Sequence, residues 1–242
     1  MEQEPKKIIH SLLPPLLLVI LMWIVKACEL YFRFDLSFLG IYPLHWKGLP
    51  GIVTGIFIHG DLSHLSANSG PVIILGGVIF YFYRRIAWTI LATLTLMTGL
   101  WVWVMARESW HIGASGLVYA MASFVFASGM IRRDNRLLAV SLLVVFLYGG
   151  LIWGVFPELF PEKNISWESH LMGIVAGIVA AVYFKNEGPA RKKYAWEDET
   201  DDEVPDWYPD EPPAPPPPSD QTPDNQEINI RYDYKEKKGE PS

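Results

Sequence analysis

Six long runs without a charged residue divide the first 184 residues of the chain. The runs cover residues 8–25, 62–83, 86–106, 109–131, 137–157 and 169–184. An apolar helix needs about 20 residues, with about 17 as the lower limit, to cross the hydrocarbon core of a bilayer. Five runs meet that length, and a few residues before Glu168 can complete the sixth. Because backbone hydrogen bonds must close within a segment in lipid, the runs predict an all-α membrane protein with six transmembrane helices.

The cations between the runs are distributed unevenly. Six spans place both termini on the same side of the membrane, and eleven Lys and Arg residues fall on that side. The other side has four. Positively charged loops mark the cytoplasmic side, so we expect both termini to be cytoplasmic.

The composition changes near residue 190. Residues 1–190 carry 13 Lys and Arg against 11 Asp and Glu, whereas residues 191–242 carry 7 against 15. Eight prolines lie within residues 205–218, and such a stretch cannot bury enough apolar surface to fold. We therefore predict a membrane domain over residues 1–190 and an acidic, Pro-rich, disordered cytoplasmic tail over 191–242. The single cysteine excludes a disulfide scaffold, and without a basic stripe we expect no nucleic-acid partner.

Three of the runs begin with polar residues, which are costly in lipid and indicate function. The second run carries His64 and Asn68, with His59 just before it, while the fourth carries Ser115 and the sixth His170. These three runs start on the non-cytoplasmic side, so all three clusters lie in the outer half of the membrane. Each has a plainer interpretation: close packing beside glycines for Ser115, hydrogen bonds between helices for Asn68 and His170, and interfacial or metal-binding histidines for His59 and His64.

One chemistry, acyl transfer, uses these residues together. A serine hydroxyl needs a base within hydrogen-bond reach, and histidine has a suitable pKa, so Ser115 and His170 are the candidate nucleophile and base. Four glycines would let their two helices approach closely: Gly113, Gly116, Gly173 and Gly177. Tyr119, one turn after Ser115, would stack on the imidazole of His170. No acid is required, and we expect Asp61 and Glu168 to stay hydrated at the surface.

Acyl transfer also needs donors for the oxyanion of the tetrahedral intermediate. The imidazole of His64, the side-chain amide of Asn68 and the backbone N–H of Ser115 are the candidates. His64 and Asn68 are four residues apart and therefore share one face of a helix.

These residues resemble the motifs of the rhomboid family of intramembrane serine proteases. The resemblance consists of Gly113-Ala-Ser115-Gly116, His170-x-x-Gly173-x-x-x-Gly177 and His59-x4-His64-x3-Asn68. The motifs stand in the family's order and in the same three spans, and the resemblance covers about residues 10–185. One difference is Trp46-Lys47 in the first loop, where the family often has Trp-Arg.

The resemblance implies a six-helix core and a serine endopeptidase without cofactor or metal. It implies a dyad of Ser115 and His170, an oxyanion hole from His64, Asn68 and the Ser115 amide that Gly113 shapes, a stacking ring at Tyr119 and a structural histidine at His59. The loop over residues 33–61 resembles a membrane-embedded hairpin. The expected partners are the lipid bilayer and single-span membrane proteins as substrates. The expected location is the plasma membrane, with the active site facing its non-cytoplasmic side.

Three other functions compete with this interpretation. A rhomboid-like pseudoprotease binds membrane clients without cutting them, but such relatives usually lose the serine or the histidine. A channel or transporter predicts polar residues through the whole membrane depth, whereas the inner halves of the second, fourth and sixth runs are apolar. A metalloprotease predicts His-Glu-x-x-His, which the sequence lacks.

Overall fold

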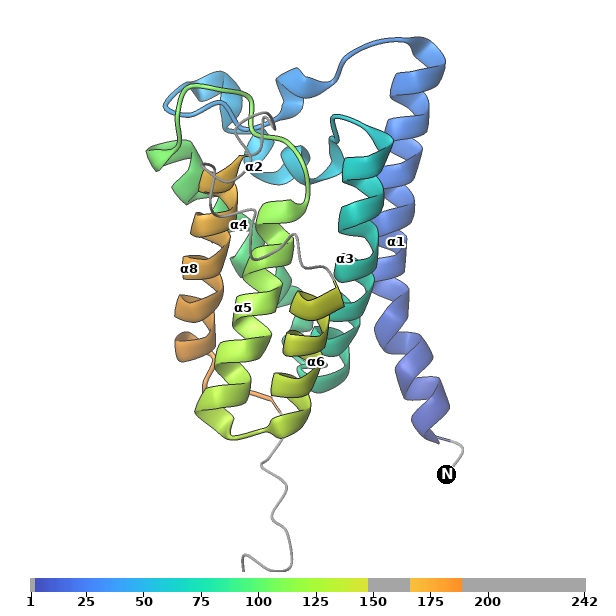
Figure 1. The fold of residues 1–242 in the computed structure, drawn as a ribbon, viewed down its shortest axis with the longest axis vertical. Coiled ribbons are helices and arrows are strands. Elements are labelled where there is room, and N and C mark those ends of the chain that lie inside the picture. The colour runs from blue at the N-terminus through green and yellow to red at the C-terminus, as the bar shows by residue number, and fades with distance from the viewer. Residues whose placement is uncertain (1–2, 148–165, 189–242) are drawn as a thin grey trace, which may run out of the picture. The chain divides into compact units, whose positions relative to one another are not determined.

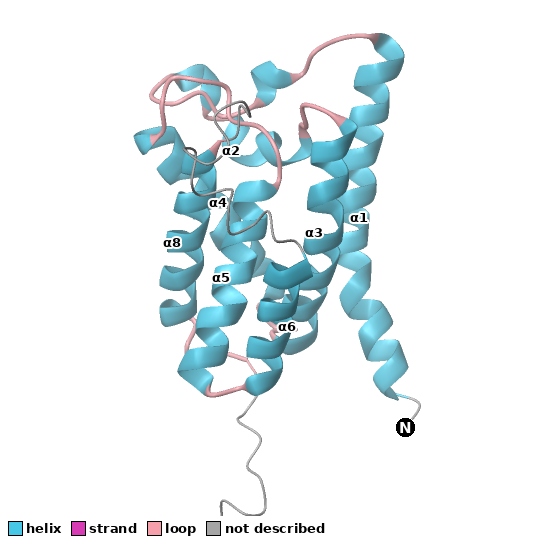
Figure 2. Ribbon diagram, in the orientation of Figure 1, coloured by secondary structure: helices cyan, strands magenta, loops and turns pink. Residues whose placement is uncertain are grey.

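The computed structural model describes residues 3–147 and 166–188, all within the first of two compact units, Met1–Lys192 and Lys193–Ser242. The described residues form helices joined by loops and contain no strand (Figure 2). The α-helices are α1 (Gln3–Phe32), α2 (Gly51–Thr54), α3 (Leu62–Phe82), α4 (Ala87–Met105), α5 (Ser115–Arg132), α6 (Asn135–Leu147) and α8 (Trp167–Tyr183). The predicted all-α fold is confirmed for this part of the chain.

Four helices in the described part of the chain are long and apolar enough to cross a membrane: α1, α3, α4 and α5. They coincide with the first four charge-free runs, which confirms the prediction of a membrane protein. The sixth run forms α8, an apolar helix of 17 residues. The fifth run begins in α6, but its second half lies outside the described residues, as does the predicted disordered tail. Six spans therefore remain a prediction, although α1 begins and α8 ends at the same end of the first unit (Figure 1).

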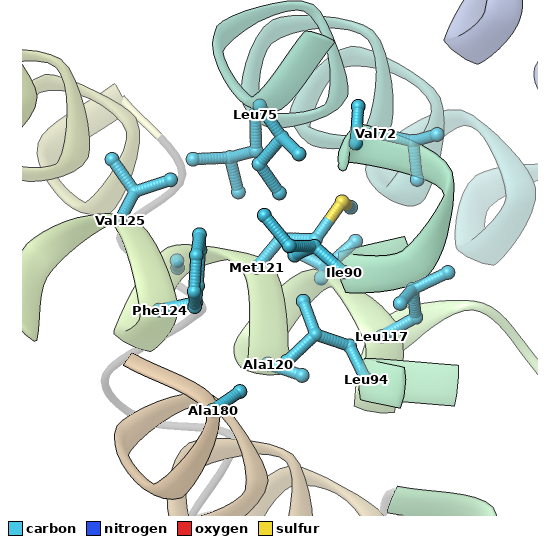
Figure 3. Packing of buried hydrophobic residues seen from close by; sticks show 14 of the residues in the cluster. Val72, Leu75, Ile90, Leu94, Leu117, Ala120, Met121, Phe124, Val125 and Ala180 are labelled. Carbon is cyan, nitrogen blue, oxygen red and sulfur yellow. The ribbon is translucent and has the colours of Figure 1, made fainter. Parts of the chain in front are cut away.

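The core of this unit surrounds α5, which packs against α3, α4, α6 and α8. Met121 and Phe124 of α5 are fully buried. Around them pack Leu75 from α3, Leu94 from α4 and Ala180 from α8 (Figure 3). A helix that is covered on several sides has its ends fixed by its neighbours, and Ser115 is the first residue of α5.

The loop over residues 33–61 is tied to the segment that leads into α5. Ile41 and His111 form an antiparallel bridge, with N–H to oxygen distances of 2.9 and 2.8 Å. The backbone N–H of Leu44 donates to the carbonyl oxygen of Trp103 at 2.9 Å. The loop thus lies against the segment before Ser115, at the same end of the unit as the start of α8 (Figure 1). Its insertion into the membrane interface stays a prediction.

Glycines allow α5 and α8 to approach closely, as the sequence predicts. A methyl group at Gly173 would clash with the carbonyl oxygen of Gly116, and one at Gly177 would clash with the hydroxyl of Ser123 and the carbonyl oxygen of Ala120. Small residues at a helix interface are typical of membrane proteins, where backbones that approach closely gain van der Waals contact.

Gly173→Ala is expected to lower the free energy of unfolding by about 1–3 kcal/mol, because the added methyl group forces α8 away from α5. Thermal unfolding in detergent measures the effect. Gly60→Ala is the matched control, since a methyl group at Gly60 meets nothing within 4 Å. Equal unfolding temperatures for the two variants would contradict this account of the interface between α5 and α8.

Candidate active site

Ser115 and His170 lie within hydrogen-bond distance of each other. Ser115 begins α5, His170 lies in the first turn of α8, and the hydroxyl Oγ of Ser115 is 2.9 Å from Nε2 of His170. The imidazole is buried, whereas Ser115 is partly exposed. In a neutral imidazole with its proton on Nδ1, Nε2 accepts a hydrogen bond from the Ser115 hydroxyl. This arrangement can deprotonate the serine as it attacks an electrophile.

The ring of Tyr119 stacks on the imidazole of His170. The ring centroids are 4.2 Å apart, and the planes differ by 16°. Tyr119 lies one turn after Ser115 on α5, so a single helix carries both the hydroxyl and the surface against which the imidazole lies. The stack restricts rotation of the ring and keeps Nε2 directed at Ser115.

Gly113 brings the backbone before Ser115 against the ring of His64. Its φ of 104° lies in the left-handed region that favours glycine. A methyl group at this position would lie 2.6 Å from Cε1 of His64. The N–H of Gly113 donates to the carbonyl oxygen of Gly55 at 2.9 Å, which fixes the turn. His64 therefore lies beside the segment that leads into Ser115.

Asn68 carries a buried donor that has no partner among residues 3–147 and 166–188. The residue is 5% exposed, and its Nδ2 makes no hydrogen bond within this part of the chain. A buried unsatisfied donor costs about 1–3 kcal/mol and is rare in native proteins. The first N–H groups of α5, including that of Ser115, also have no carbonyl partner within their own helix. Such groups are suited to an anionic oxygen that enters the site during a reaction.

His59, near the end of the loop over residues 33–61, contacts the backbone at the start of α5. It is 1% exposed, and its Nε2 accepts from the N–H of Ala114 at 3.3 Å, while Nδ1 lies 3.4 Å from the carbonyl oxygen of Phe57. Burial and, next, the neighbouring His64 lower the pKa of His59 to about 4. His59 is therefore neutral at pH 7, as an acceptor at Nε2 requires. Its ring also lies edge-on to that of His64, with centroids 5.0 Å apart.

A buried ion pair on α1 holds the backbone of His59, and the sequence analysis did not identify it. The ammonium group of Lys26 donates to the carbonyl oxygens of His59 and Gly60 at 2.8 and 3.0 Å and to Glu29 at 3.2 Å. The other oxygen of Glu29 accepts from the N–H of Leu36 at 3.0 Å. Opposite charges three residues apart at the end of an apolar run are the signal that could have revealed it.

The two acids expected at the surface, Asp61 and Glu168, differ in their exposure to solvent. Asp61 is exposed and caps α3 by accepting from the N–H of His64 at 2.8 Å. The expectation is wrong for Glu168, which is 6% exposed. One of its oxygens pairs with Nε of Arg107 at 3.4 Å, and the other is buried without a partner among the described residues. Glu168 is buried because the first turn of α8 lies against the segment between α4 and α5.

No group of three or more His, Cys, Asp or Glu side chains among residues 3–147 and 166–188 could hold a metal ion. The histidines of the site instead contact backbone groups, hydroxyls and aromatic rings. The chemistry that the site can supply is that of a serine with an adjacent base and several hydrogen-bond donors.

Comparison with known proteins finds one matching family and several relatives. The family described as the rhomboid domain matches residues 46–187. An uncharacterized protein of Mycobacterium tuberculosis is 32% identical over 73% of this chain and 75% of its own length. An uncharacterized protein of Mycobacterium leprae is 30% identical over 74% and 72%, respectively. A protein of Acanthamoeba polyphaga mimivirus that is named a rhomboid protein is 28% identical over 53% and 71%. Since the match to the rhomboid domain covers more than half of the sequence and runs from before His59 to beyond His170, this chain belongs to the rhomboid family.

Proposed function

We propose that this protein is an intramembrane serine endopeptidase that cleaves single-span membrane proteins through a dyad of Ser115 and His170. The observation that carries the proposal is the 2.9 Å approach of the Ser115 hydroxyl to Nε2 of His170, made by the ends of two apolar helices. The rhomboid family consists in general of intramembrane serine proteases and includes inactive members. The presence of both residues in one contact favours the active class.

The proposed reaction follows from the positions of the donors and acceptors. Ser115 Oγ attacks the scissile carbonyl carbon and transfers its proton to Nε2 of His170. The carbonyl oxygen becomes an oxyanion and accepts from Nδ2 of Asn68, the His64 imidazole and the N–H of Ser115. His170 then gives its proton to the leaving amine. Water attacks the acyl-enzyme with His170 again as base, and the serine is restored.

The proposal includes the membrane topology of the enzyme and the side of the membrane that its active site faces. The excess of Lys and Arg on the side of the termini supports cytoplasmic termini in a six-span topology. The site lies at the opposite end of the first unit from the start of α1, so it would face the non-cytoplasmic side of the plasma membrane (Figure 1). Substrates reach it from the bilayer as transmembrane helices whose ends unwind near Ser115.

Covalent labelling of the purified protein in detergent by a fluorophosphonate probe tests this function without a known substrate. We expect labelling of the wild type and none of Ser115→Ala, because an activated serine is the group that the probe modifies. Ser123→Ala is the matched control on the same helix, since its hydroxyl donates to backbone oxygens of α5, and it should be labelled normally. Labelling of Ser115→Ala would overturn the dyad. A folded wild type that resists labelling would favour a protein that binds membrane clients without cutting them.

A further inference from the structure

A chain of hydrogen bonds connects the segment before α5 with the first turn of α8. Nε2 of His111 lies 3.0 Å from the carbonyl oxygen of Arg107, and Nδ1 lies 2.5 Å from the hydroxyl of Ser166. The hydroxyl of Ser166 lies 2.6 Å from that of Ser169. His111 is 3% exposed, and the reaction described above does not use it. The chain ends one residue from His170.

The direction of each hydrogen bond follows from the acceptor at one end. A carbonyl oxygen can only accept, so Nε2 of His111 carries the proton and donates to Arg107. In the neutral ring Nδ1 is then an acceptor, and the hydroxyl of Ser166 donates a hydrogen bond to it. Burial lowers the pKa of His111 from its usual value of 6.5, which favours this neutral form. The hydroxyl of Ser169 then donates to that of Ser166, so each hydrogen bond in the chain has one defined direction.

Ser166 connects this chain to the backbone that carries the base. Its carbonyl oxygen accepts from the N–H of Ser169 at 3.1 Å and from that of His170 at 3.4 Å. The backbone of His111 is itself fixed by the bridge to Ile41. A second link, between Arg107 and Glu168, joins the same two segments. The segment between α4 and α5 therefore fixes the position of the first turn of α8.

We infer that His111 is a positioning residue, which fixes the first turn of α8 through Ser166 and so holds the imidazole of His170 on Ser115. The inference rests on the proposed function and extends it to a residue outside the dyad and the oxyanion hole. His111 touches no reacting atom. Its effect is on the distance and angle between nucleophile and base, where a misplacement of about 1 Å can cost on the order of 100-fold in rate.

Two substitutions of His111 separate its two hydrogen bonds. The amide of asparagine takes the place of Nδ1, so His111→Asn keeps an acceptor for Ser166. The amide of glutamine reaches the place of Nε2, so His111→Gln keeps the donor for Arg107 and loses the acceptor. We expect His111→Gln to lower the rate constant of fluorophosphonate labelling at saturating probe by on the order of 10- to 100-fold, with unchanged probe affinity and unfolding temperature. His111→Asn should keep most of the wild-type rate.

Hydrogen exchange of the backbone of residues 166–172 gives a readout that needs no activity. In His111→Gln, exchange there should rise by about fivefold, the factor expected for loss of one hydrogen bond, while the rest of the protein is unchanged. His10→Gln, at an exposed histidine of α1, is the control and should behave as the wild type. Unchanged exchange in His111→Gln would overturn the inference, whether or not the wild type is labelled. Equal labelling rates for the Asn and Gln variants, or a loss that only follows a lower unfolding temperature, would also overturn it. Absence of labelling in the wild type would instead count against the proposed function.

Discussion

Replacing His170 by alanine is expected to slow covalent labelling of Ser115 by on the order of 100- to 10,000-fold. In the proposed mechanism, Nε2 of His170, which lies 2.9 Å from the Ser115 hydroxyl, takes the proton of that hydroxyl during attack. Without that base the serine stays a weak nucleophile, although the oxyanion donors are untouched. The measurement is the labelling rate constant of wild type and variant with the same probe, in the same detergent.

The fold should survive this change. His170 lies in the first turn of α8, and the glycine contacts that hold α8 to α5 lie further along the helix, at Gly173 and Gly177. Thermal unfolding and circular dichroism of His170→Ala should therefore remain close to those of the wild type. His10→Gln is the control for loss of a histidine outside the site. Wild-type labelling in a folded His170→Ala would show that Ser115 is activated by another group and would remove His170 from the mechanism.

Spacing within one element accounts for what the sequence predicts well. The i, i+4 relation of Ser115 and Tyr119 places both on one face of α5, and the charge-free runs mark the helices because lipid excludes charge. The close approach of α5 and α8 at Gly173 follows from the same reasoning, because small residues are what such an interface requires. These features depend on local geometry and on the properties of the bilayer.

Contacts between distant segments explain what the sequence does not reveal. His111 and Ser166 are 55 residues apart, and no spacing in the sequence indicates that their side chains meet. Lys26 stands at the end of an apolar run, and two of its three partners are backbone carbonyl oxygens, which no sequence pattern marks. The burial of Glu168 depends on how the segment between α4 and α5 covers the first turn of α8. The burial of a side chain at a helix end is therefore set by the segments that cover that end and not by the helix itself.

Replacing Asn68 by leucine is expected to lower the activity without lowering the stability. Loss of one oxyanion donor lowers the labelling rate constant by about 100- to 1000-fold, and by less if His64 and the Ser115 amide compensate. Loss of a buried amide with an unpartnered Nδ2 should leave the free energy of unfolding unchanged or raise it, because the unsatisfied donor costs about 1–3 kcal/mol in the resting protein. Labelling kinetics and thermal unfolding of the same sample measure both.

This pair of effects distinguishes an oxyanion donor from a residue that merely holds helices together. A residue that merely holds helices together would lose stability when it is replaced. Ser69→Ala shows the structural pattern on the neighbouring residue, since the Ser69 hydroxyl accepts from the indole of Trp23 at 3.1 Å and so joins α3 to α1. We expect that variant to lose some stability and keep its labelling rate. If His64→Ala, Asn68→Leu and the double variant all kept the wild-type rate, α3 would have no part in stabilising the oxyanion, and the unpartnered amide of Asn68 would need another explanation.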